Sequence, residues 1–188
     1  MKMNPNSPLG LACTAISLAL LSALALLLPD DAISRYALLR DYTTLCRTFI
    51  PGIDRLARVS SFPEVTTVVV SVMWTLVPFL TAIYFLRMRI PIGFWQRVRR
   101  NRFYFAFSII VVVVSIGLIV VIYDVEPNDL EGGLLNERIL YGVSTSRLGL
   151  GLVAGLFLSA IAPLLCMVLM WLTNIRHIYF EQRGGNRL

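Results

Sequence analysis

The chain has 188 residues, of which 57% are hydrophobic and 15% charged, and its mean hydropathy is +0.74. A soluble domain is about half apolar or less, so this composition excludes an ordinary soluble enzyme or binding domain. Seventeen Lys and Arg residues against eleven Asp and Glu give a formal net charge of +6, and the placement of these charges argues against a nucleic-acid-binding protein.

Four apolar stretches carry no charged side chain, and each is long enough to cross a bilayer as a helix. They are residues 9–28, 65–86, 103–123 and 148–172. An α-helix needs about 20 apolar residues to cross ~30 Å of hydrocarbon, so we expect the first stretch to be a retained span and not a cleaved signal peptide, whose apolar core is about 7–15 residues. We therefore predict an all-α integral membrane protein, a four-transmembrane-helix bundle forming a single membrane domain over residues 1–188.

The charges in the loops predict how these spans are oriented. Between the second and third spans lie six arginines and no acid, whereas residues 124–147 hold five acids and two arginines. Cytoplasmic loops are enriched in Lys and Arg, so we expect the basic loop and both termini in the cytoplasm. The cations are sixteen arginines and one lysine, a bias typical of GC-rich genomes, and we expect a bacterial inner membrane.

Small residues recur at every fourth position in the first and last spans. The two stripes are Ala15, Ala19 and Ala23, and Gly151, Gly155 and Ser159. Small side chains let helix backbones approach closely in lipid. Each stripe is therefore a predicted helix-packing interface, either within the bundle of one chain or with a second copy or another membrane protein.

The first outward loop contains an amphipathic segment at about residues 35–50. In a helical projection its apolar residues share one arc: Leu38, Leu39, Tyr42, Leu45, Cys46, Phe49 and Ile50. Thr43 and Arg47 belong to the polar arc, and Pro51-Gly52 is expected to end the helix. We predict an amphipathic interfacial helix at the outer membrane boundary or capping the bundle, with a docking surface for an extracytoplasmic partner as the alternative.

Two prolines lie inside predicted spans, Pro78 in the second and Pro163 in the fourth. Each removes one intrahelical hydrogen bond, frees the carbonyl of Trp74 or Ser159, and is expected to kink its helix. Kinks at matching depth can open a vestibule between spans, as broken helices do in transporters, whereas ordinary kinks carry no function. Both interpretations stay open from the sequence.

The predicted cytoplasmic loop between the second and third spans mixes cations with apolar residues. The expected lipid-headgroup contacts are Arg87, Arg89, Arg97, Arg99, Arg100 and Arg102, with Trp95 as an interfacial anchor. Each cation near an anionic membrane surface contributes about 1 kcal/mol of binding free energy. We therefore expect membrane lipids, and not nucleic acid, as partners of this loop.

Residues for metal, redox or proton chemistry are sparse. The chain has one histidine, His177, and three dispersed cysteines, Cys13, Cys46 and Cys166, without a CxxC motif. None of the four predicted spans contains Asp, Glu, Lys or Arg. Haem, zinc and ion-coupled transport sites usually need such residues, so we expect no cofactor, no metal site, no catalytic residue and no enzyme activity.

Three functional classes agree with these features. The leading one is a non-catalytic membrane protein acting through helix-helix and protein-protein contacts, as an accessory subunit of a membrane assembly or a protective protein of the toxin-immunity or exclusion type. The second is a small oligomeric channel or transporter component, motivated by the two prolines and the hydroxyl-rich second span. The third is an anionic-lipid-binding scaffold, motivated by the basic loop.

Overall fold

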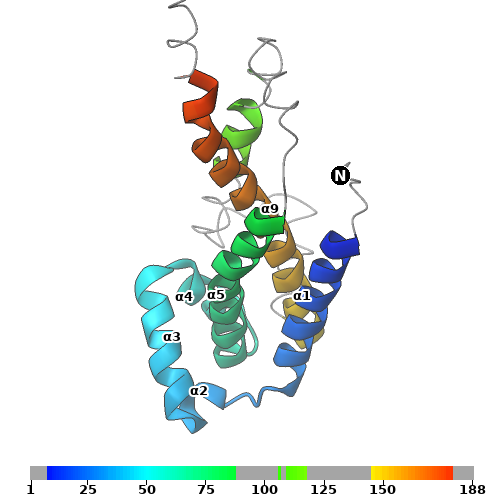
Figure 1. Cartoon of the computed structure of the whole chain (residues 1–188). Helices are drawn as coiled ribbons and strands as arrows, with labels where there is room; N and C mark the ends of the chain where they lie inside the picture. Colours follow the sequence, from blue (N-terminus) through cyan, green and yellow to red (C-terminus); the bar gives the residue numbers. More distant parts are fainter. Residues whose placement is uncertain (1–7, 88–105, 107–108, 118–144, 180–188) are drawn as a thin grey trace, which may run out of the picture.

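The computed structural model describes residues 8–87, 106, 109–117 and 145–179, and all regular secondary structure in these ranges is helical. The helices are α1 (Pro8–Leu27), α2 (Ala32–Arg35), α3 (Ala37–Phe49), α4 (Gly52–Val59), α5 (Pro63–Arg87) and α9 (Arg147–Tyr179) (Figure 1). Residues 109–117 are helical as well.

Three of the described helices are long and apolar enough to cross a membrane. The qualifying segments are Gly10–Leu27 of α1, Pro63–Leu86 of α5 and Arg147–Thr173 of α9. They coincide with the first, second and fourth predicted spans. The third predicted span, residues 103–123, is described only at 106 and 109–117, and its other residues lie outside the described part of the chain. The architecture is compatible with a helical membrane protein.

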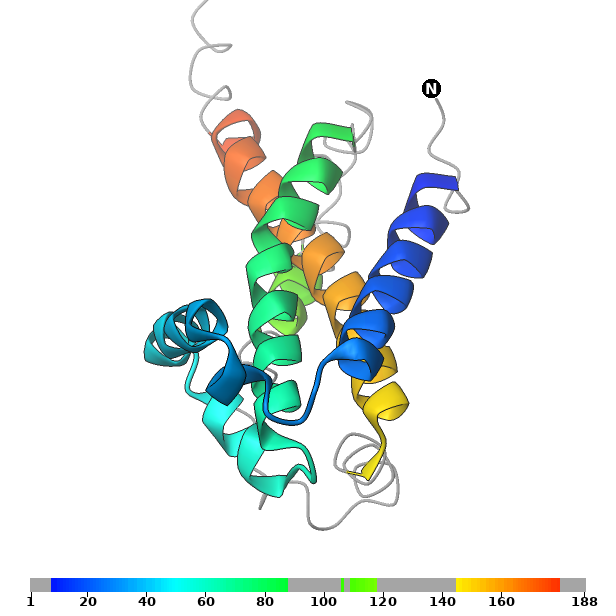
Figure 2. The same cartoon turned by 90° about the horizontal axis from the view of Figure 1, so that it is seen from below.

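The core lies where α1, α5 and α9 meet, with α9 against both other helices (Figure 2). We call the end of the bundle at which α1 ends and α5 and α9 begin the outer end. The buried cluster nearest this end comprises Leu21, Ala25, Ile53, Val65, Val69, Val70, Met73, Val77, Leu150, Ala154, Leu158 and Ile161. A smaller cluster further along α5 and α9 comprises Tyr84, Ala162, Cys166 and Met170.

Helix α5 is enclosed over its first turns and open further along. Seven consecutive residues, 65–71, are buried, because α9 covers one side of the helix while α3 and α4 lie on another (Figure 1). Further from the outer end, Phe79 is 63% exposed and Ile83 is 42% exposed. Helices α3 and α4 therefore cover only the outer part of α5.

The predicted amphipathic segment, residues 35–50, forms α3 over Ala37–Phe49. It is separated from α2 by Tyr36, whose backbone is extended. Pro51-Gly52 ends α3 as predicted, but a further helix that the sequence analysis did not predict, α4, begins at once. Pro51 has φ −64°, the value that proline fixes and that suits the start of a helix. The same dipeptide thus ends one helix and begins the next.

The face of α3 that packs against the bundle is not the centre of its predicted apolar arc. Leu38, Leu45 and Phe49 of the apolar arc are 80%, 60% and 67% exposed, whereas Thr43 of the polar arc is only 1% exposed. Cys46 and Ile50 pack against the outer core cluster. The face of α3 that meets the bundle therefore lies along the border between the two arcs.

Candidate interaction site

Two glycines of α9, Gly151 and Gly155, lie close against α1. A Cβ atom placed on Gly151 would contact the Ser22 Cα and lie 2.8 Å from the Leu21 carbonyl oxygen. A Cβ on Gly155 would lie 2.8 Å from the Leu18 Cα. The third residue of this stripe, Ser159, is half-buried, and its hydroxyl donates to the Gly155 carbonyl at 2.7 Å. In this structure the Gly151 and Gly155 face of α9 is occupied by α1 of the same chain.

The alanine stripe of α1 lies on another face of that helix. Ala15, Ala19 and Ala23 are all exposed, whereas Leu21 and Ala25 are buried in the contact with the rest of the bundle. The two small-residue stripes predicted from the sequence therefore do not pack against each other. In the backbone arrangement, α1 lies beside α9 (Figure 2).

Both predicted kink positions lie inside continuous helices, Pro78 in α5 and Pro163 in α9. Pro78 is exposed and Pro163 is half-buried. A polar contact between these helices lies beside Pro163, where the Thr81 hydroxyl donates to the Ala162 carbonyl at 3.3 Å. This contact joins α5 to α9 at a buried position.

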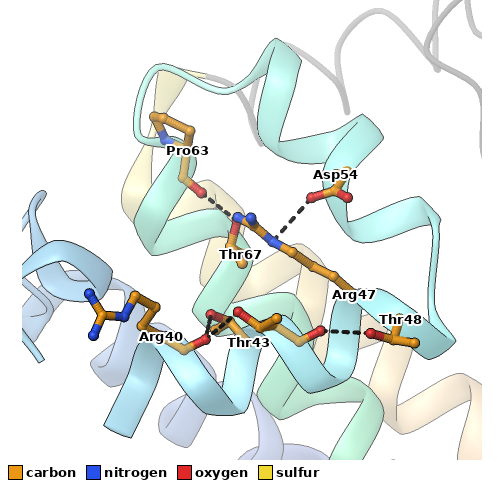
Figure 3. A network of polar contacts seen from close by, with 8 residues as sticks. Arg40, Thr43, Arg47, Thr48, Asp54, Pro63 and Thr67 are labelled. Atoms are coloured by element: carbon orange, nitrogen blue, oxygen red, sulfur yellow. Dashed lines mark hydrogen bonds and ion pairs between the residues drawn. The ribbon is translucent and has the colours of Figure 1, made fainter. Parts of the chain in front are cut away.

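A polar cluster joins α3, α4 and α5 near the outer end (Figure 3). Arg47 of α3 places its Nε 3.1 Å from an Asp54 carboxylate oxygen of α4, and its Nη2 donates to the Thr67 hydroxyl of α5 at 3.0 Å. The same Thr67 hydroxyl donates to the Pro63 carbonyl at 2.8 Å. Arg47 thereby holds three helices together through one guanidinium group.

A second hydrogen bond between α3 and α5 connects Tyr42 with Thr75, with 2.7 Å between their hydroxyl oxygens. Because the Thr75 hydroxyl donates to the Ser71 carbonyl at 2.9 Å, Tyr42 is the donor in the bond with Thr75. Burial raises the pKa of the Tyr42 phenol, which keeps its proton in place. Thr67 and Thr75 are thus used alike: each donates within α5 and accepts from α3.

Glu64, in the first turn of α5, binds the start of α2. Its carboxylate accepts the backbone N–H groups of Ile33 at 2.7 Å and Ser34 at 3.1 Å, and also the Ser34 hydroxyl. The first N–H groups of a helix have no partner within it, so an acceptor at this place stabilises the helix start. Asp31, at the N-cap position of α2, makes no side-chain capping bond.

Arg147 joins the outer ends of α1 and α9. Its guanidinium donates to the Leu28 carbonyl at 2.6 Å, forms an ion pair with Asp30, and stands 5.8 Å from the ring centroid of Phe62. In the sequence analysis Arg147 counted only as a charge in an outward loop. The sequence does show that Arg147 directly precedes one apolar stretch and that Asp30 follows another by two residues. These positions alone do not indicate that the two side chains form an ion pair.

The remaining predicted site residues lie mostly outside the described ranges. Arg87 is the last residue of α5, and Arg89, Trp95, Arg97, Arg99, Arg100 and Arg102 belong to residues 88–105, which are not described. Within the described ranges, no three His, Cys, Asp or Glu side chains are grouped as metal ligands. Cys13, Cys46 and Cys166 are free thiols.

Neither a protein-family model, nor a curated protein, nor a solved structure matches this chain. The described residues by themselves define the class, a helical protein with three helices able to cross a membrane. Two helix-helix contacts are well formed, α1 against α9 at two glycines and α3 against α5 at two threonines. The alanine face of α1 is exposed.

Proposed function

We propose that this chain is a four-span protein of a bacterial inner membrane, with both termini in the cytoplasm, that acts through helix-helix contacts with another membrane protein. Its role would be that of an accessory subunit of a membrane assembly or of a protective protein of the toxin-immunity or exclusion type. In this proposal residues 103–123 form the third span in chain order. Helix α3 lies at the surface of the inner membrane that faces away from the cytoplasm.

The observation that carries the proposal is the exposed small-residue face of α1. Ala15, Ala19 and Ala23 stand on one side of a helix that is long and apolar enough to span the bilayer, and all three are exposed. Small residues allow close approach of a second helix in lipid. The corresponding surface of α9 at Gly151 and Gly155 is already filled by α1, whereas the three alanines stay exposed among the described residues.

The hydroxyl groups of α5 also favour protein contacts over a water-filled path. Thr67 and Thr75 bond to α3, and Thr81 bonds to α9. A hydroxyl that bonds to a neighbouring helix stabilises the packing of the two helices. The hydroxyl groups of α5 were the reason to consider a channel. At these three positions they are instead engaged in contacts between helices.

The proposal is tested by purifying the tagged full chain from native membranes in a mild detergent and measuring the mass of the intact complex. We expect a stoichiometric membrane-protein partner. Ala19→Leu adds bulk to the alanine face and should release that partner, whereas Ile16→Leu, a change of shape at a neighbouring exposed position, should retain it. A monomer in native membranes, or equal partner recovery from both variants, would contradict the proposed use of this face.

The protective role has its own test in the organism that encodes the chain. Deleting the gene should raise sensitivity to a membrane-active toxin encoded nearby, and expression of the full chain should restore resistance. If sensitivity to every nearby toxin is unchanged, the accessory-subunit role is retained and the protective role is dropped. Liposomes that contain the chain alone should show no ion flux, and a measurable flux would support the channel class instead.

A further inference from the structure

Helix α3 carries an exposed apolar ridge formed by Leu38, Leu45 and Phe49. An exposed leucine is common on any protein, but three large apolar side chains on one stripe of an amphipathic helix form a surface suited to an apolar environment. In Figure 1 α3 is seen lengthwise, and in Figure 2 it is seen end-on beside a lengthwise α5. Helix α3 therefore crosses α5 steeply and runs across the direction of the candidate spans.

Two hydrogen bonds fix how α3 is rolled about its own axis. At 3.6 residues per turn, Tyr42 stands about 40° from Leu38, beside the ridge, whereas Arg47 stands about 180° from Leu38. Arg47 bonds to Thr67, near the start of α5, and Tyr42 bonds to Thr75, about 12 Å further along the helix. The side of α3 that bears the ridge therefore faces the later turns of α5, and the opposite side faces the outer end.

The surface directly beyond the ridge is apolar and exposed. Continuing along α5 from Thr75, Phe79 is 63% exposed and Ile83 is 42% exposed, on a helix able to span the membrane. The ridge thus continues the exposed apolar surface of α5. This continuity identifies acyl chains, and not water, as the environment of the ridge.

The opposite side of α3 has the charge that suits a lipid surface. Arg40, about 200° from Leu38, is exposed, and in Figure 3 its guanidinium points away from the Arg47 cluster. An exposed cation on the side opposite an apolar ridge complements anionic phosphate groups lying above acyl chains.

We propose that the Leu38–Leu45–Phe49 ridge is a lipid-binding surface that inserts into the acyl chains of the outer leaflet, with Arg40 at the level of the headgroup phosphates. The roll of α3 set by the Tyr42–Thr75 and Arg47–Thr67 bonds holds the ridge in this direction. This inference rests on the membrane placement of α1, α5 and α9, and it is independent of what binds the alanine face of α1.

The test uses the full chain in liposomes of phosphatidylcholine and phosphatidylglycerol, with the three native cysteines replaced by alanine. Leu38→Cys, Leu45→Cys and Thr44→Cys each receive a nitroxide label, and Thr44 is the matched control because it is exposed on the polar side of the same turns. Power-saturation spectroscopy then compares the accessibility of each label to oxygen, which concentrates in lipid, with its accessibility to nickel-EDTA diacetate, which stays in water.

We expect a higher oxygen-to-nickel accessibility ratio at positions 38 and 45 than at position 44. Equal or reversed ratios would place the ridge in water and overturn the proposal. Low accessibility to both reagents at positions 38 and 45 would show that a protein, either a second copy or a different partner, covers the ridge, and would overturn it too.

A second measurement keeps the native cysteines, in case their replacement disturbs the fold. Leu45→Trp and Thr44→Trp are compared in liposomes whose lipids carry bromine on the acyl chains, which quenches nearby indole fluorescence. The Leu45→Trp chain should be quenched more strongly than the Thr44→Trp chain relative to the unsubstituted protein. Equal quenching would contradict acyl-chain insertion. Neither result depends on whether the membrane-protein partner of α1 is found.

Discussion

Replacing Gly151 with alanine adds one methyl group at a close contact between α9 and α1. The added Cβ would stand 2.8 Å from the Leu21 carbonyl oxygen and 2.9 Å from the Ser22 nitrogen, and these backbone atoms cannot rotate aside as a side chain would. Overpacking of this kind costs about 1–3 kcal/mol. Replacing glycine with alanine within a helix also stabilises the helix by about 0.8–1.0 kcal/mol. We therefore expect Gly151→Ala to lower the free energy of unfolding by up to about 2 kcal/mol, or up to roughly 30-fold in the unfolding equilibrium constant.

The assay is equilibrium unfolding of the full chain in mixed micelles, followed by helical circular dichroism as the fraction of denaturing detergent rises. Gly117→Ala is the matched control, because a Cβ at Gly117 has no atom within 4 Å. That variant should be unchanged or more stable by up to about 1 kcal/mol. If Gly151→Ala were as stable as Gly117→Ala, the close contact between α1 and α9 would be refuted.

Two further predictions use the same unfolding assay. Arg147→Met should lower the free energy of unfolding by about 1.5–3 kcal/mol, because it removes a charged donor from the Leu28 carbonyl. Asp30→Asn should lower it by less than about 1 kcal/mol, since the Asp30 side chain is 75% exposed. Equal losses in the two variants would show that the bond to Leu28 adds nothing to stability. In a double-mutant cycle, Arg47→Met and Thr67→Val should show a coupling of about 0.5–1.5 kcal/mol, and strict additivity would mean that the bond between α3 and α5 is absent.

The long apolar helices were predictable because their signal lies in the chain itself. The stretch 9–28 corresponds to α1 at Pro8–Leu27, and 65–86 corresponds to α5 at Pro63–Arg87. Helix α9 continues to Tyr179, seven residues beyond the predicted end of the apolar stretch at residue 172. The end of an apolar stretch shows where the apolar surface stops, whereas a helix can continue into polar residues that still satisfy each other's backbone hydrogen bonds.

The roll of α3 was not predictable from its own residues. A helical projection separates apolar from polar side chains, and it places Thr43 on the outside of the bundle. Thr43 is buried because Arg47 and Tyr42 bond to partners 20 and 33 residues away in the chain. The same limit applies to Arg147, whose ion-pair partner is 117 residues away. Pairings of this length depend on how the helices pack, which local composition does not specify.

Site-specific photocrosslinking in native membranes can show whether the alanine face of α1 binds another membrane helix, as we propose. A photoreactive amino acid is placed at Ala19 on the small-residue face and, in a second chain, at Leu20 on a neighbouring exposed face. We expect one discrete protein adduct from position 19 and a much weaker one from position 20. Lipid adducts alone at position 19, or the same protein adduct in equal yield from both positions, would contradict it.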